Sequence, residues 1–74
     1  MIVMIDRIES IYHMNNWLKV GYIVYYESGA KRKYTSWAKL PVKCQEYIGY
    51  CNVHGHTRRT VANGINTRIY KKRA

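Results

Sequence analysis

Apolar and aromatic residues alternate with a more mixed set along residues 17–27, and this alternation predicts a β-strand at the centre of the fold. Every even position from Leu18 to Tyr26 is apolar or aromatic, whereas the odd positions also include a lysine, a glycine and a glutamate. A period of two with β-branched and aromatic residues is typical of a strand, and the uniformly apolar face is expected to face the core. Residues 31–34 then return as a second, strongly basic strand.

A short turn is expected to join these two strands. Ser28, Gly29 and Ala30 interrupt the apolar run, and a loop of Gly29 and Ala30 would place glycine where a type II′ turn needs a positive φ. This loop predicts one opposite-charge pair and one aromatic pair between the strands: Glu27 with Arg32, and Tyr25 with Tyr34. On that register five residues would share the less apolar face: Trp17, Lys19, Tyr25, Arg32 and Tyr34.

The flanking segments predict a further strand and a helix. Residues 2–13 fit both a helical stripe and a strand. The asparagines at 15 and 16 favour a turn, so we interpret residues 4–13 as the first strand of a meander. Pro41 suits the first position of a helix over residues 42–52, and Gly55 is the expected terminator. One apolar stripe of this helix would pack on the sheet: Cys44, Tyr47, Ile48 and Cys51.

The C-terminal segment predicts a β-hairpin around Asn63-Gly64, the strongest short hairpin signal in the chain. With these two residues as the loop, four cross-strand pairs follow: Ala62 with Ile65, Thr60 with Thr67, Arg59 with Arg68, and Arg58 with Ile69. Like charges directly opposite each other are unfavourable, so the Arg59 and Arg68 pair needs an explanation. Either an anion binds between the two guanidinium groups, or both side chains extend into water.

The resulting order of elements is β-β-β-α-β-β in a single domain of residues 1–74. This order predicts a small α+β fold, in which a three-stranded antiparallel meander packs on one helix and a C-terminal β-hairpin follows. The same order also occurs in a five-stranded OB-like barrel, and an SH3-like barrel is a further alternative. A core this small is expected to need a barrel, a cross-link or a partner, and a dimer is one such solution.

The charge is strongly asymmetric along the chain. The net charge is +9, and residues 31–74 hold eleven of the thirteen lysines and arginines but only one of the four acids. This asymmetry favours a polyanionic partner, with nucleic acid first and an acidic protein surface or an anionic membrane second, although high charge can also serve solubility alone. The longest apolar run has seven residues, too short for a membrane span, and no signal peptide is visible. We therefore expect a cytoplasmic protein without a membrane partner.

Basic and aromatic residues are interleaved, as a nucleic-acid-binding surface requires, because cations neutralise phosphates and aromatic rings stack on bases. The candidate nucleic-acid-binding residues are Lys19, Tyr25, Lys31, Arg32, Lys33, Tyr34, Arg58, Arg59, Arg68, Lys71, Lys72 and Arg73. The alternative is that a second layer of the fold covers the face of Trp17 and Tyr25. When no partner is bound, the last three of these candidates, Lys71, Lys72 and Arg73, are expected to form a solvated, flexible tail.

Neither a metal site nor catalytic chemistry is expected. The spacing of Cys44, Cys51, His54 and His56 is not a usual zinc pattern. On a helix the two cysteines would lie about 10 Å apart along the axis, which favours two buried thiols over a disulfide or a single metal site. The four acids are scattered, and no phosphate-binding glycine loop or nucleophile set is present. We therefore predict a protein that is not an enzyme and has no cofactor.

Residues 17–50 resemble the three-stranded-sheet-plus-helix DNA-binding modules found at the N-terminus of phage-type tyrosine integrases and in plant AP2 domains. The resemblance rests on Trp17, the strand VGYIVYY, the return SGAKRKYTSW and the helical segment PVKCQEYIGY. In that family the sheet enters the major groove of DNA. The resemblance implies that four residues would lie near DNA: Lys19, Tyr25, Arg32 and Tyr34.

Two hypotheses about function follow from the sequence. The first is a non-enzymatic nucleic-acid-binding protein that grips phosphates with the basic hairpin and the C-terminal basic cluster. The second is a small inhibitor of the kind that phages and mobile elements encode, whose basic face binds a host nucleic-acid-processing protein. DNA and RNA, single and double strands, are all candidate ligands for the first hypothesis.

Overall fold

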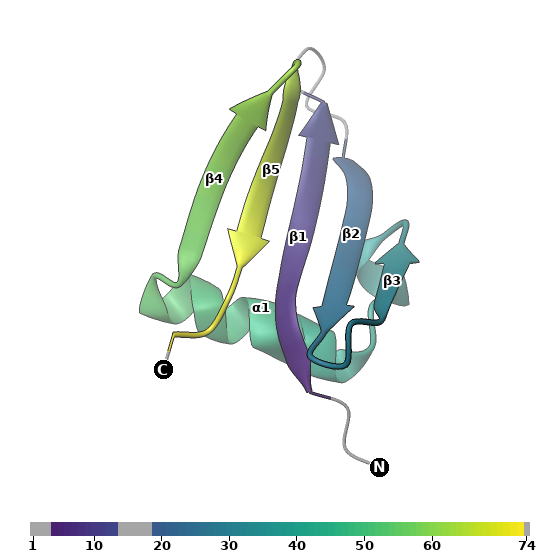
Figure 1. Ribbon diagram of the computed structural model, residues 1–74, viewed down its shortest axis with the longest axis vertical. Coiled ribbons are helices and arrows are strands. Elements are labelled where there is room, and N and C mark those ends of the chain that lie inside the picture. The colour runs from purple at the N-terminus through teal and green to yellow at the C-terminus, as the bar shows by residue number, and fades with distance from the viewer. Residues whose placement is uncertain (1–3, 14–18, 74) are drawn as a thin grey trace.

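A computed structural model describes residues 4–13 and 19–73 of the chain. The described residues form one antiparallel β-sheet with one α-helix packed across one of its faces (Figure 1). The elements in chain order are β1 (Ile5–His13), β2 (Lys19–Tyr26), β3 (Lys31–Tyr34), the short 3₁₀ helix η1 (Trp37–Lys39), α1 (Val42–His54), β4 (Thr57–Ala62) and β5 (Ile65–Tyr70). The predicted α+β class and the predicted order of strands and helix are confirmed.

All five strands belong to a single sheet with the order β3-β2-β1-β5-β4. The predicted meander of β1, β2 and β3 is present, but its description as a separate three-stranded sheet is wrong because β5 pairs with the free side of β1. In the central part of the sheet Ile8 of β1 lies between Val24 of β2 and Tyr70 of β5. Among the described residues β3 and β4 are the two edges, so the sheet is open and the barrel alternatives are wrong.

The core lies between the sheet and α1, and the helical stripe predicted from the sequence forms its helix side. Cys44, Tyr47, Ile48 and Cys51 are all buried, and they pack against Ile8, Tyr22, Val24 and Tyr70 of the sheet and against Leu40. Gly55 ends the helix as predicted, with a left-handed φ of 70° and its N–H bonded to the Cys51 carbonyl. Pro41 lies one position earlier than predicted, as the N-cap residue. Burial of this stripe fixes α1 across the lower part of the sheet (Figure 1).

The hairpin between β2 and β3 has a different register from the predicted one. Its loop contains three residues, because the Tyr26 N–H bonds the Ala30 carbonyl at 2.9 Å and the Gly29 N–H bonds the Tyr26 carbonyl at 2.9 Å. Gly29 occupies the last loop position with a φ of 96°, which is the usual place of glycine in a three-residue hairpin loop. Tyr25 therefore lies opposite Lys31 rather than Tyr34, a shift of three residues.

This shift exchanges the two faces of β3, because a shift by an odd number of residues turns every side chain to the other side of the sheet. Arg32 and Tyr34 lie opposite Val24 and Tyr22, on the face that α1 covers. The predicted grouping of Arg32 and Tyr34 with Tyr25 on one face is therefore wrong. Lys31 and Lys33 take the opposite face instead.

The C-terminal hairpin has the predicted loop and register. Asn63 and Gly64 have φ values of 53° and 73°, as a two-residue type I′ loop requires. All four predicted pairs are present, including Arg59 opposite Arg68. The first strand is confirmed as well, whereas the predicted turn at positions 15 and 16 and the placement of Trp17 lie outside the described residues.

Candidate nucleic-acid interface

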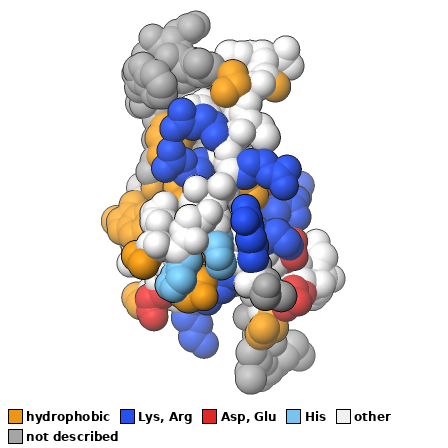
Figure 2. All heavy atoms as spheres, turned by 90° about the vertical axis from the view of Figure 1, so that its left-hand side faces the viewer, with side chains coloured by type: hydrophobic (Ala, Val, Ile, Leu, Met, Phe, Trp, Pro, Cys, Tyr) orange, Lys and Arg blue, Asp and Glu red, His pale blue; other side chains and the backbone are white. Residues whose placement is uncertain are grey.

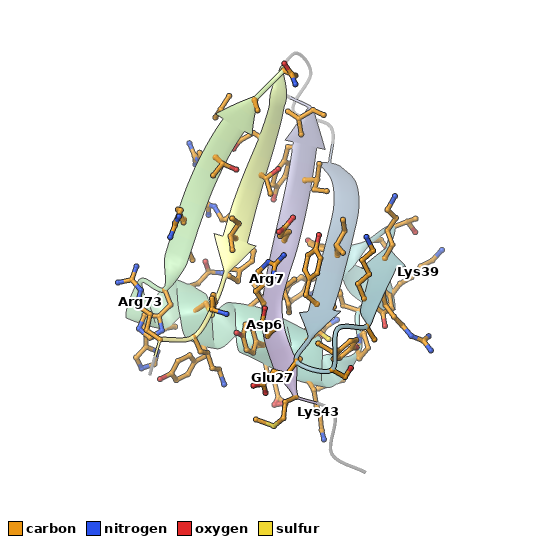
Figure 3. All side chains as sticks on the ribbon, in the orientation of Figure 1. Asp6, Arg7, Glu27, Lys39, Lys43 and Arg73 are labelled. Carbon is orange, nitrogen blue, oxygen red and sulfur yellow. The ribbon has the colours of Figure 1, made fainter. Side chains whose placement is uncertain are left out.

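The two faces of the sheet differ in what covers them. The helix face carries Ile8, Tyr22, Val24 and Tyr70 and packs against α1. Because side chains alternate along a strand, the neighbouring positions form the opposite face, which we call the open face. It includes Arg7, Glu9, Ile11, Ile23, Tyr25, Lys31, Lys33, Arg58 and Ile69. Figure 3 shows Arg7 near the middle of the sheet and Arg73 at the foot of β4.

The predicted cations fall at the two edges of the sheet. Lys31, Arg32 and Lys33 form the exposed edge strand β3. The other group belongs to β4, β5 and the residues after them: Arg58, Arg59, Arg68, Lys71, Lys72 and Arg73. Viewed toward the β4 edge, lysine and arginine side chains stand on both sides of the strand (Figure 2). Thus these nine predicted cations, which lie between positions 31 and 73, form two separate groups in space.

A first hollow at the β4 edge lies on the helix face, and we call it the arginine hollow. It has a volume of about 210 Å³ and is lined by Tyr12, Arg59, Asn66 and Arg68. Arg59 and Arg68 lie directly opposite each other on β4 and β5, and Asn66 lies opposite Tyr12 of β1. Among the described residues no acid lines this hollow. Its lining therefore combines two positive charges with an amide and a phenol.

A second hollow, the open-face hollow, lies on the other side of the same edge. It has a volume of about 240 Å³, and its lining residues are Arg7, His56, Thr57, Arg58, Ile69, Lys71 and Arg73. No acid among the described residues lines it either. Four cations from three segments that are distant in sequence thus share one small cavity.

Part of the positive charge of the open-face hollow is paired. The Arg7 guanidinium bonds Asp6 at 3.0 Å and Glu9 at 3.2 Å, and it also lies 3.9 Å from the centre of the Tyr25 ring. Lys71 bonds the other oxygen of Asp6 at 2.7 Å, and this bond is the main reason that the pKa of Asp6 is lowered. Asp6 thereby links β1 to the chain after β5 and holds both cations in place.

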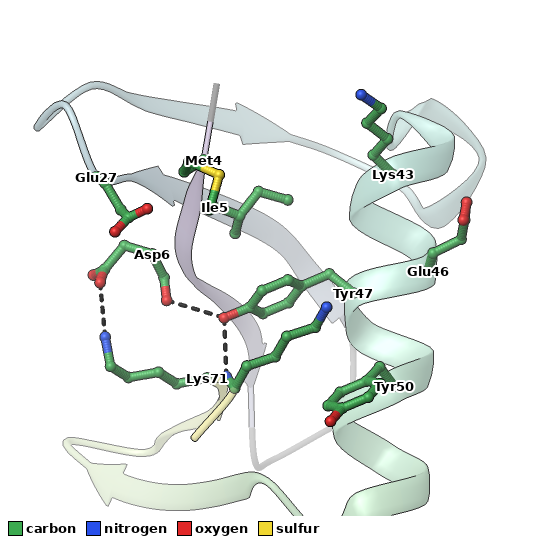
Figure 4. A pocket seen from close by; sticks show the side chains of 10 residues that line it. Met4, Ile5, Asp6, Glu27, Lys43, Glu46, Tyr47, Tyr50 and Lys71 are labelled. Carbon is green, nitrogen blue, oxygen red and sulfur yellow. Dashed lines mark hydrogen bonds and ion pairs between the residues drawn. The ribbon is translucent and has the colours of Figure 1, made fainter. Parts of the chain in front are cut away.

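The residues after β5 are fixed to the rest of the fold, so the prediction of a solvated tail is wrong for their backbone. The Tyr47 hydroxyl donates to the Asp6 carbonyl at 3.0 Å and accepts the Lys72 N–H at 3.0 Å (Figure 4). The Arg73 N–H bonds His56 Nδ1 at 3.2 Å. The side chains of these residues nevertheless remain exposed: Lys71 and Arg73 line the open-face hollow, and the Lys72 ammonium lies 4.5 Å from the centre of the Tyr50 ring.

Replacing Tyr47 by phenylalanine is expected to loosen this segment. The substitution keeps the buried ring but leaves the Asp6 carbonyl and the Lys72 N–H without their shared partner, which should cost about 1–2 kcal/mol of unfolding free energy. Urea unfolding followed by circular dichroism measures this loss. Tyr50→Phe, on the same helix but exposed, is the matched control and should change stability little. Equal stability of the Tyr47→Phe variant and the wild type would refute the bridging role.

The remaining predicted residues are placed less favourably for binding. Tyr34 is half-buried against the core, and Tyr25 has one ring face under Arg7. Lys19 lies in β2 opposite Tyr12, and its side chain is outside the described part of the structure. The structure does not bring Tyr25, Arg32 and Tyr34 together.

Sequence reasoning missed six residues that line the two hollows: Arg7, Tyr12, His56, Thr57, Asn66 and Ile69. Arg7, Tyr12 and Asn66 reach the site through the pairing of β1 with β5, which the sequence reasoning did not foresee. A polar Asn66 within an otherwise β-prone segment was the one available signal.

The cysteines and histidines lie in different environments. Cys44 and Cys51 are free thiols in the core, and burial raises the pKa of both. His54 stacks on Tyr50 with 3.9 Å between the ring centres. The ring centres of His54 and His56 are 5.9 Å apart. No group of three or more His, Cys, Asp or Glu side chains that could hold a metal ion occurs in the described part of the chain.

A larger cavity lies between the start of β1 and the first turns of α1, away from the arginine hollow (Figure 4). Its volume is about 690 Å³. Acids and lysines line it in equal number: Asp6, Glu27, Glu46, Lys43, Lys71 and Lys72. This mixed lining is less suited to a polyanion than the two hollows at the β4 edge.

Comparison with known proteins gave no match to a protein family, to a curated protein or to a solved structure. No helix in the described part of the chain is long and apolar enough to cross a membrane. The case for a function therefore rests on the geometry and charge of the two hollows.

Proposed function

We propose that this protein is a non-enzymatic nucleic-acid-binding protein that grips phosphates with the β4–β5 hairpin and the residues after it. The observation that carries this proposal is the pair of basic hollows on opposite sides of one edge strand. Arg58 lines one hollow and Arg59 lines the other, so consecutive residues of β4 present guanidinium groups on both sides of the edge. A strand of nucleic acid that crosses this edge would meet cations on either side.

Arginine is well suited to this task. Its planar guanidinium forms bidentate hydrogen bonds to phosphate oxygens, and it stays charged at any pH that the protein meets. Tethering of the segment after β5 through Tyr47 and His56 supports the proposal further, because cations held in place lose less conformational freedom on binding. The exposed cations of β3, at the opposite edge, would supply a second and weaker contact.

The resemblance to integrase-type and AP2-type modules stays a prediction. The register of β2 and β3 changes how such a module would be used, because Arg32 and Tyr34 lie on the helix face. A sheet that entered a groove with its open face would present Lys31 and Lys33 instead. The hairpin edge is the part of the surface on which the charge is most concentrated.

Fluorescence anisotropy of labelled duplex DNA, single-stranded DNA and RNA tests the proposal. We expect submicromolar binding at ~50 mM salt that weakens steeply toward ~200 mM, because each phosphate contact releases condensed counterions. The form that binds most tightly identifies the nucleic acid. Weak binding of all three forms, without a steep salt dependence, would refute the proposal.

One observation favours the second candidate, a small inhibitor that binds an acidic protein surface. Four isoleucines lie on the open face: Ile11, Ile23, Ile65 and Ile69. Ile23 and Ile69 flank Glu9 in the row that crosses this face, and Lys33 and Arg58 stand at the two ends of that row. Apolar side chains interspersed with polar and charged ones occur at protein interfaces. Such an inhibitor need not bind nucleic acid by itself, so the anisotropy experiment separates the two candidates.

A further inference from the structure

Arg59 and Arg68 form the least favourable cross-strand pair of the sheet. They lie directly opposite each other on the helix face, and two like charges in this position repel. The pair does not sit on flat surface but lines the arginine hollow together with Tyr12 and Asn66. An anion bound in this hollow would be attracted by both guanidinium groups, and it would offset their mutual repulsion.

Asn66 supplies an independent observation at the same place. Its side chain is only 6% exposed, it lines the hollow, and its Oδ1 atom has no hydrogen-bond partner. Buried polar groups nearly always have a partner, because an unpaired one loses its bonds to water without replacement. A carboxamide can turn by 180° and present its NH₂ group instead of its oxygen. In that orientation Asn66 would donate to an anion held by the two arginines.

The buried Ser10 hydroxyl, on the neighbouring strand β1, has the same anomaly. Ser10 is fully buried, its oxygen has no hydrogen-bond partner, and it lies opposite Arg68 across β1 and β5. Two unsatisfied polar side chains therefore flank the arginine pair. Ser10 is fully buried and does not line the hollow, so of these two side chains only Asn66 can bond an occupant.

The charge of the hollow indicates the kind of anion. Two guanidinium groups contribute two positive charges, and no acid among the described residues lines the cavity. Tyr70, two residues after Arg68 on the same face, is neutral because burial raises the pKa of its hydroxyl, which is already high. A phosphate monoester carries a charge of about −1.5 to −2 at neutral pH, whereas an internal phosphodiester carries only one negative charge. The monoester is therefore the better electrostatic match.

We propose that the arginine hollow binds a phosphate monoester, and that this monoester is the terminal phosphate of a nucleic-acid strand. The inference rests on the proposed function, since the open-face hollow and the tethered cations would hold the rest of the strand. Arg59 and Arg68 grip the phosphate oxygens, and the Asn66 amide donates to the same group. Tyr12, which also lines the hollow, lies where it can contact the terminal nucleotide.

The test compares labelled oligonucleotides of one sequence that end in a 5′-phosphate, a 3′-phosphate or hydroxyls only. We expect one phosphorylated end to bind the wild-type protein about tenfold more tightly than the hydroxyl-ended strand, as one charge-assisted hydrogen-bond set would give. Arg59→Gln and Arg68→Gln should abolish this preference. Arg58→Gln, which removes a cation from the open-face hollow, should weaken all three strands and keep their ratio.

Each outcome decides a separate point. Tight, salt-dependent binding of all three strands with equal affinity would overturn this inference and leave the proposed function standing. If no strand binds, the proposed function fails and the assignment to a strand end fails with it. In that case inorganic phosphate or a nucleoside monophosphate would show whether the hollow binds a free monoester, through a rise in the melting temperature that Arg59→Gln removes.

Discussion

Replacing Gly21 by alanine should destabilise the protein by at least about 2 kcal/mol, because strained backbone and a steric clash coincide at this position. Gly21 has a φ of 154°, a conformation that residues with a side chain rarely adopt. A Cβ atom there would lie 2.6 Å from the Tyr34 carbonyl oxygen, a backbone atom of the neighbouring strand β3. Relief of this clash would require β3 to move away from β2. That movement would also disturb the packing of Tyr34 against the core.

The chain offers a matched control in Gly49 of α1. A Cβ atom at Gly49 would have no neighbour within 4 Å, so alanine there should stabilise the helix by about 0.5–1 kcal/mol. The two substitutions are chemically identical and should act in opposite directions. Urea unfolding of both variants measures the difference. A Gly21→Ala variant as stable as the wild type would show that β2 and β3 do not pair as described.

Removing one arginine from each hollow should give the largest loss of binding. The double variant Arg58→Gln with Arg59→Gln changes two exposed residues of β4. Because neither side chain belongs to the core, the fold should persist. Charge-assisted hydrogen bonds contribute about 1.5–3 kcal/mol each, which corresponds to an affinity for nucleic acid at least about a hundredfold lower. The slope of log K against log salt should flatten by about 1.8 on duplex DNA, for two lost phosphate contacts.

A control with the same change in net charge separates local contact from general electrostatics. Lys39→Gln with Lys43→Gln removes two exposed cations near the start of α1, neither of which lines the hollows. Anisotropy titrations at several salt concentrations compare the two double variants. If both lose affinity equally, net charge alone drives binding, and the hollows at the β4 edge are not the interface.

Local signals in the sequence were reliable wherever the conformation depends on a few neighbouring residues. A type I′ loop requires left-handed φ at both of its residues, and Asn63-Gly64 is the sequence that accepts this most easily. The two residues therefore determined the loop and with it the pairing of Arg59 with Arg68. The stripe of Cys44, Tyr47, Ile48 and Cys51 repeats with the helical period, which left only one face for burial.

The central hairpin shows where such signals are ambiguous. A two-residue and a three-residue loop both accept Gly29 at a left-handed position, and the segment contains nothing that excludes either of them. The shift of three residues between the two registers moved Arg32 and Tyr34 to the helix face. A small difference in loop geometry therefore changed the predicted binding surface completely.

By itself, the sequence determined the elements, the helical core stripe, the C-terminal register and the concentration of charge in the second half of the chain. Only the tertiary structure decided that β5 pairs with β1, and this contact assembles both hollows. It places Tyr12 beside Asn66 and brings Arg7 near Arg58 and Arg73. The physical reason is that turns and periodicity depend on a few neighbouring residues. The choice of strand neighbours depends instead on pairing both edges of β1 while one face of the sheet packs on α1.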